Sequence, residues 1–206
     1  MGANGYPYAY TTVTGDTVNN LSRSGLYWFA DETNPLYADG YNSGVLGLLL
    51  HLQGSAVNTI SARQIFFPNR HVSGAGSNCR VEREKTSEGE WLPWEFVNPP
   101  IVHGFEYRTT ERYLGKPVYV KAIDFGSLPN NTLKVITFGD STIKMISAHG
   151  IMNGGYVIPG CTGSSDYPTQ EMQIITYNGG NVGVMTHTDR SNHTAVIVAK
   201  YWKTTD

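Results

Sequence analysis

One short polar segment carries residue types that could bind a ligand or a metal. Residues 187–193 read His-Thr-Asp-Arg-Ser-Asn-His and place two histidines around one predicted turn. The His-x5-His spacing is not a familiar zinc-ligand spacing, so we predict no metal. Asp189, Arg190 and Asn192 offer planar donors and acceptors that suit sugar hydroxyls. Loops on a rigid scaffold often carry binding residues, so we predict that these three contact a ligand. The alternative is a solvated turn with one hydrogen-bonded imidazole.

Aromatic side chains give three further candidates. Tyr167 is the one aromatic residue in a long polar loop predicted over residues 160–168. Trp91 and Trp94 are separated by Leu-Pro. An exposed indole is a good platform for the apolar face of a sugar ring. The alternative, which we favour, is that both indoles seal a core, because aromatic side chains bury large areas.

Carboxylates are the residues that a glycan-cleaving enzyme would need, as a pair at a defined separation. Nothing in the sequence pairs the available candidates, which are Glu106, Glu111, Asp124, Asp140 and Glu171. A Gly-x-Ser-x-Gly elbow, a His-Glu-x-x-His motif and a phosphate-binding glycine loop are all absent. A 20–30-residue repeat of the kind that builds a β-helix is absent too. We therefore expect a protein that is not an enzyme and needs no cofactor.

The charge balance argues against nucleic acid as a partner. Charged residues make up 16% of the 206 residues, against about 25% in typical domains, and the net charge is −2. Arg80, Arg83 and Lys85 are interleaved with Glu82 and Glu84, so they form no basic run. A surface that follows phosphates is therefore not indicated.

Signals for export, membrane insertion and disulfides are weak. The first ten residues lack a basic segment and an apolar core, so we expect no signal peptide. The longest apolar run, within residues 45–52, is far shorter than a membrane span, and we expect no membrane insertion. Cys79 and Cys161 have no nearby cysteine, so a disulfide or zinc site is not expected.

Short apolar alternations separated by turn residues predict a mainly β protein. The predicted strands in the second half cover residues 105–113, 117–125, 133–138, 143–147, 172–177, 182–187 and 194–202. Residues 178–181, Asn-Gly-Gly-Asn, predict a hairpin turn. Pro99 and Pro100 follow Asn98 and favour a boundary there, because proline removes a backbone donor. We thus predict two domains, a small β module over residues 1–98 and an antiparallel β-sandwich over residues 99–206.

Two sets of motifs resemble those of bacteriophage and prophage tail fibres. Residues 20–94 are similar to the knob module named after pyocin tail fibres. That likeness rests on residues 25–29, 42–46, 62–67 and the Trp-x-x-Trp of 91–94. Residues 101–206 are similar to the distal head of prophage fibres. The second likeness rests on residues 110–113 (Thr-Glu-Arg-Tyr), 116–119 (Lys-Pro-Val-Tyr), 124–132 and 203–206 (Lys-Thr-Thr-Asp).

The resemblance implies a homotrimeric receptor-binding tip on the rest of a phage tail. Such a protein is made in the host cytoplasm, resides in the virion and binds a polysaccharide or protein of the bacterial surface. No coiled-coil or collagen-like shaft precedes the knob, so the chain looks like a distal fragment or a short fibre. Two alternatives stay open. One is a glycan depolymerase on a fibre tip, and the other is a structural capping or trimerisation domain that contacts no receptor.

Overall fold

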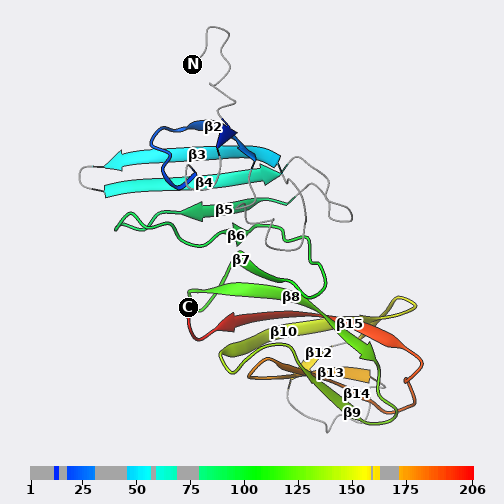
Figure 1. Ribbon diagram of the computed structural model, residues 1–206. Coiled ribbons are helices and arrows are strands. Elements are labelled where there is room, and N and C mark those ends of the chain that lie inside the picture. Colours follow the sequence, from blue (N-terminus) through cyan, green and yellow to red (C-terminus); the bar gives the residue numbers. More distant parts are fainter. Residues whose placement is uncertain are drawn as a thin grey trace. The chain divides into compact units, whose positions relative to one another are not determined.

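The protein, represented by a computed structural model, is built almost entirely from β-strands (Figure 1). The structure describes residues 12–13, 18–30, 46–56, 59–68, 79–158, 160–162 and 172–206. The chain divides into two compact units, Met1–Pro100 and Ile101–Asp206. The division falls two residues after the boundary that the sequence suggested. No helix in the described ranges is long and apolar enough to cross a membrane.

The described part of unit 1 has six strands, which are neighbours in chain order. They are β1 (Thr12–Val13), β2 (Gly25–Ala30), β3 (Leu46–Ala56), β4 (Thr59–Pro68), β5 (Val81–Glu84) and β6 (Glu95–Phe96). The first pair is parallel, and the pairs from β2 to β6 are antiparallel. β3 and β4 form the long central hairpin, drawn in cyan in Figure 1.

One face of the unit 1 sheet forms the core of the unit. Leu49 pairs with Phe66, and Phe66 pairs with Val81 on the next strand. All three side chains are fully buried. The ring of Phe29 meets that of Phe66 edge to face, with the centroids 5.2 Å apart. Side chains alternate along a strand, so the residues between these point to the opposite face.

That opposite face is also apolar. We call it the outer apolar face, and it consists of Leu26, Trp28, Leu48, Leu50, Leu52, Ile65 and Phe67. Its members are only partly covered, and Leu52 and Phe67 remain 44% and 41% exposed. A sheet with apolar side chains on both faces is typical of one that is covered on both sides.

In the described residues of unit 2, five strands follow one another in one sheet and four strands form a second sheet. The first has the order β7 (Glu106–Tyr113), β8 (Lys116–Ser127), β15 (Thr194–Lys203), β10 (Ile143–Met152) and β11 (Tyr156–Ile158). The second has the order β12 (Gly160–Thr162), β13 (Met172–Tyr177), β14 (Asn181–Thr186) and β9 (Leu133–Thr137). All pairs but one are antiparallel, as predicted.

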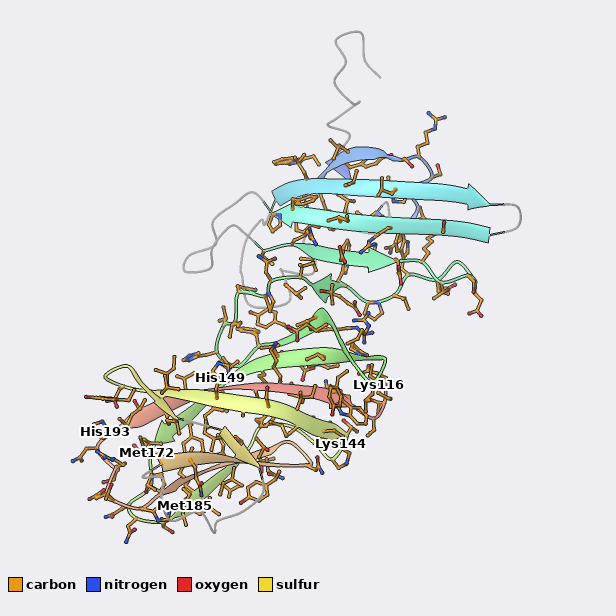
Figure 2. All side chains as sticks on the ribbon, turned by 180° about the vertical axis from the view of Figure 1, so that it is seen from behind. Lys116, Lys144, His149, Met172, Met185 and His193 are labelled. Carbon is orange, nitrogen blue, oxygen red and sulfur yellow. The ribbon has the colours of Figure 1, made fainter. Side chains whose placement is uncertain are left out.

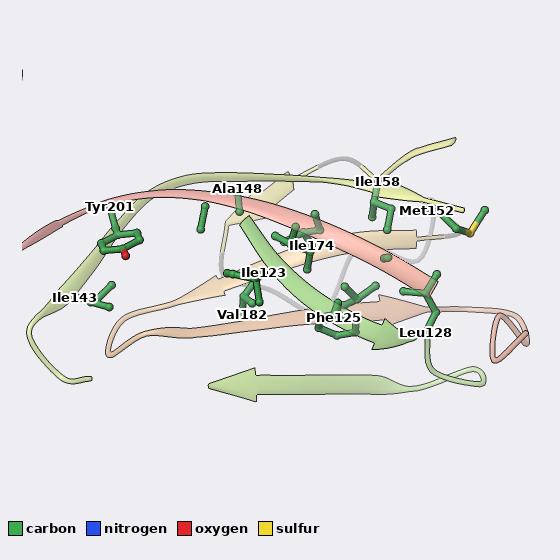
Figure 3. Packing of buried hydrophobic residues seen from close by; sticks show 14 of the residues in the cluster. Ile123, Phe125, Leu128, Ile143, Ala148, Met152, Ile158, Ile174, Val182 and Tyr201 are labelled. Carbon is green, nitrogen blue, oxygen red and sulfur yellow. The ribbon is translucent and has the colours of Figure 1, made fainter. Parts of the chain in front are cut away.

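The core of unit 2 lies between these two sheets (Figure 3). Ile123, Ile197 and Tyr201 come from the five-stranded sheet, while Ile174 and Val182 come from the four-stranded one. This arrangement agrees with the predicted β-sandwich. One pair differs from the expectation, because β12 runs parallel to β13. A parallel pair needs a crossover connection, so the turn signals of a simple meander do not predict it.

Candidate functional site

A cation–aromatic group in unit 1 brings together two of the predicted site residues. We call Arg83, Lys85, Trp91 and Trp94 the cation–indole cluster. The Cζ atom of Arg83 lies 4.5 Å from the ring centroid of Trp91 and 4.3 Å from that of Trp94. The Nζ atom of Lys85 lies 5.1 Å from the Trp91 ring. These distances are within the range of cation–π contacts.

Two local features of the chain build this cluster. Alternation along β5 turns Arg83 toward Gln64 on β4, its register partner. Lys85 forms an isolated antiparallel bridge with Trp91, which returns the chain after a short turn. The backbone N–H of Lys85 donates to the carbonyl oxygen of Ala62 at 2.8 Å. Main-chain bonds therefore place the first indole beside the two cations.

Hydrogen bonds fix the orientation of the Arg83 guanidinium. Its Nε donates to Oε1 of Gln64 at 2.9 Å, and its Nη2 donates to Oδ1 of Asn19 at 2.6 Å. The indole Nε1 of Trp91 donates to the backbone oxygen of the same Asn19 at 3.0 Å. The cluster is thus connected to β4 and to the turn before β2.

In the described part of the chain, no acid balances the charge of Arg83. Among the described residues, no carboxylate is within ion-pair distance of Arg83 or Lys85. Glu82 points to the other face of β5, where it pairs with Arg63 at 2.6 Å. Burial lowers the pKa of Arg83 to about 10, because desolvation disfavours the charged form.

A buried histidine packs next to the cluster. His51 is fully buried, and its Nδ1 lies 3.2 Å from Nε2 of Gln64. Its ring centroid is 6.2 Å from that of Trp91. Burial is the main cause that lowers the pKa of His51 below 6.5, and the positive charges of Lys85 and Arg83 lower it further.

The two predicted indoles therefore have a structural role in addition to any ligand role. Both side chains are half-buried, and their rings lie against the Arg83 guanidinium. The favoured interpretation from sequence, that the indoles are packing groups, is consistent with this geometry. Their partial exposure still leaves indole surface available for a ligand.

The polar loop of unit 2 has a fixed backbone. Oδ1 of Asp189 accepts hydrogen bonds from the backbone N–H and the hydroxyl of Ser191, at 2.9 and 2.7 Å. These two bonds lower the pKa of Asp189. The backbone N–H of Arg190 donates to the carbonyl oxygen of Pro129 at 3.2 Å. Asp189 and Asn192 are exposed, and Arg190 is half-buried.

The histidines at the ends of this loop have different environments. Nδ1 of His193 lies 3.0 Å from Oδ1 of Asn153, whereas Nε2 of His187 is buried and has no hydrogen-bond partner among the described residues. Within the described residues, no group of three or more potential metal ligands is present. The loop thus contains one hydrogen-bonded imidazole, and its tip carries exposed polar groups.

Residues 187–193 and the last residue of the chain lie at opposite ends of unit 2. Figure 2 shows His193 at one end of unit 2 and Lys116 and Lys144 at the other. Lys116 donates to the backbone oxygen of Asp206 at 2.5 Å, so the last residue lies at the Lys116 end. The ten residues of β15 separate the loop from the end of the chain.

The candidate carboxylates are engaged by their own neighbours. Glu106 accepts from the Tyr201 hydroxyl and the Lys203 ammonium group, and Glu111 pairs with Lys200. The other two described carboxylates bind nearby groups, Asp124 the N–H of Gly126 and Asp140 the N–H and hydroxyl of Thr142. Tyr167 and Glu171 lie outside the described residues.

Comparisons with known proteins give two structural matches. Neither a protein-family model nor a curated protein matches the sequence. An N-truncated R2-type pyocin tail fibre is similar over 97% of this chain and 98% of its own, with 9% identity and a TM-score of 0.29. A C-terminal part of the R1 pyocin fibre of P. aeruginosa is similar over 96% of this chain and 67% of its own, with 10% identity and a TM-score of 0.28. TM-scores and identities this low do not establish a function for this chain.

Proposed function

We propose that this chain is the receptor-binding part of a phage or prophage tail fibre. It binds a polymer of the bacterial surface, most simply a carbohydrate, and mediates attachment. In this proposal the protein belongs to the virion tail after synthesis in the host cytoplasm. The motifs in residues 101–206 that resemble tail fibres occupy the hairpin of β7 and β8, the segment that follows β8 and the end of β15.

The observation that carries the proposal is the fixed polar loop at residues 187–193. Two backbone N–H groups that lie outside the loop bind its backbone. Those of Leu128 and Asn131 donate to the carbonyl oxygens of His193 and Thr188 at 2.8 and 3.2 Å. The exposed groups of Asp189 and Asn192 are therefore presented on a scaffold that needs little ordering. A preorganised surface loses less conformational entropy on binding.

The surroundings of the candidate carboxylates favour binding over cleavage. Glycosidases place two carboxyl groups at about 5–9.5 Å across the scissile bond, with environments that separate their pKa values. Here Glu106 and Glu111 are each paired with a lysine. Both carboxylates are therefore engaged by groups of their own chain. We therefore propose a binder and not a depolymerase.

The outer apolar face supports self-association as part of the function. Exposed apolar patches of this kind mark interaction sites in soluble proteins. A closed ring of copies is the usual way for identical chains to bury such a surface. We propose a homotrimer, in which three copies of a weak binding loop act together through high effective concentration.

The test is incubation of purified protein with capsular or wall polysaccharide from several bacterial strains. Retention of the protein on a polysaccharide, with no release of reducing ends, is the expected result. Release of reducing ends would favour the depolymerase. Asn192→Ala is the cleaner loop variant, since Asp189→Ala also removes the bonds that shape the turn at Ser191. A trimer that binds no strain or polysaccharide would favour the structural capping domain.

A further inference from the structure

The cation–indole cluster contains a partly buried positive charge that has no counter-ion among the residues that the structure describes. Transfer of a charge away from water is costly unless an opposite charge or hydrogen bonds compensate. Gln64 and Asn19 use two of the five guanidinium N–H donors of Arg83. Both partners are neutral amides, so they supply hydrogen bonds and no negative charge.

Lys85 adds a second positive charge at the same place. Its side chain is half-buried, and it faces the same indole as Arg83. The two cations also act on His51, since both lower its pKa. The neighbouring acids of β5 do not offset this potential, because alternation places Glu82 and Glu84 on the other face. The cluster is therefore electropositive as well as aromatic.

We propose that the cation–indole cluster is a binding site for an anionic group of a surface polysaccharide, a carboxylate or a phosphate on a sugar. Arg83 and Lys85 supply the charge, and Trp91 and Trp94 pack against the sugar ring. A guanidinium is well suited to a planar carboxylate or a phosphate, because its donors form a rigid fork. This inference rests on the proposed function and adds the chemical class of the ligand.

The test compares Lys85→Gln with Lys144→Gln. Both variants remove one positive charge, but Lys144 is a half-buried lysine on β10 in unit 2. Lys85 is the better target than Arg83, because Arg83 also holds Gln64 and Asn19 in place. Melting curves of both variants establish that each is folded. Lys85→Arg keeps the charge and should bind like the parent.

The probes are polygalacturonate, poly(glycerol phosphate) and neutral dextran, with binding measured by calorimetry at 50 and 200 mM salt. We expect the parent to bind at least one anionic polymer and not dextran, with weaker binding at high salt. Lys85→Gln should bind about 10-fold more weakly, which corresponds to the loss of one charged contact worth about 1.4 kcal/mol. Lys144→Gln should bind like the parent. The polymer that binds identifies the carboxylate or the phosphate as the recognised group.

Two outcomes would overturn the inference. One is a parent that binds neither anionic polymer, and the other is an equal loss of binding in the Lys85 and Lys144 variants, which would indicate a general charge effect. A parallel adsorption assay with bacterial cells distinguishes failure of the anionic site from failure of the proposed function. Adsorption without binding to either anionic polymer would leave the receptor-binding proposal in place and remove only the anionic site.

Discussion

Gln64 donates a hydrogen bond from Nε2 to Nδ1 of His51, with the two nitrogens 3.2 Å apart. The neighbours of Gln64 fix this direction. Arg83 can only donate, so it faces the amide oxygen, and the carbonyl oxygen of Val18 can only accept, so it faces Nε2 at 2.6 Å. Nδ1 of His51 must therefore accept. The proton of the neutral ring is on Nε2, which lies 3.4 Å from Oε1 of Gln53.

This network predicts that acid destabilises unit 1. A proton on Nδ1 of His51 would face an N–H donor, in a place where burial, and to a smaller extent the charges of Lys85 and Arg83, already lower the pKa of His51 below 6.5. The unfolded chain then binds the proton more readily, so stability falls as the pH drops through 6.5 toward the lower folded-state pKa. Melting followed by tryptophan fluorescence between pH 7.5 and 5 should show this loss.

His51→Asn provides the control for the pH prediction. Its amide oxygen can still accept from Gln64, but the side chain does not titrate. The variant should be less stable overall because it loses ring volume, and its melting temperature should depend less on pH. Parallel pH profiles for the parent and the variant would show that other groups cause the acid sensitivity.

A second prediction concerns the two indoles. Trp94→Ala removes a ring from the Arg83 guanidinium and should destabilise unit 1 by about 1–3 kcal/mol, below the 3–5 kcal/mol of a fully buried Trp. Trp91→Phe keeps an aromatic face but loses the bond to the Asn19 oxygen, so it should cost about 1 kcal/mol. Denaturant unfolding measures both. A Trp94→Ala variant that unfolds like the parent and loses ligand binding would make the indole a sugar platform only.

The hairpin between β7 and β8 gives a third prediction. Tyr113 pairs with Lys116, so the turn has two residues, and Leu114 has φ 52° while its side chain is 82% exposed. A left-handed backbone costs about 1–2 kcal/mol for most residues, whereas Asn before Gly is favoured in such turns. Leu114→Asn should stabilise unit 2 by about 1 kcal/mol in denaturant unfolding. Leu114→Ala keeps the backbone cost, so an equal gain in both variants would refute the explanation.

The sequence predicted much of unit 2 because its strands alternate clearly and its turns contain strong signals. β13, Met172–Tyr177, was predicted with its exact bounds, and the Asn-Gly-Gly-Asn turn lies where expected. β11 and the parallel position of β12 were missed, since short strands that depend on distant partners carry little local signal.

The charge at the candidate site was harder to infer. Arg83 lies between Glu82 and Glu84 in the sequence, which suggested that the charges cancel. The alternation of a strand separates them onto two faces and leaves Arg83 on the side of Lys85 and the indoles. Strand alternation could have indicated this separation, but the partners of Arg83 come from residues far apart in the chain, such as Asn19.

A fourth prediction tests the outer apolar face. Leu52 pairs with Arg63 across the β3–β4 hairpin, so Leu52→Glu should be tolerated by the folded sheet through the opposite charge. If copies associate through this face, the variant should shift from a trimer to the 22.7 kDa monomer in light scattering. A parent that is already monomeric at micromolar concentration would contradict the trimer.

Attachment to bacterial cells is the most direct test of the central claim, that this chain binds a bacterial surface without degrading it. The measurement is adsorption of fluorescently labelled protein to a panel of bacterial strains, with unlabelled protein as competitor. We predict saturable, competable adsorption to at least one strain, with a lower plateau or affinity for Asn192→Ala. The account would be contradicted if, on every strain, adsorption rose linearly and unlabelled protein did not compete. Release of reducing ends from the cells would also contradict it.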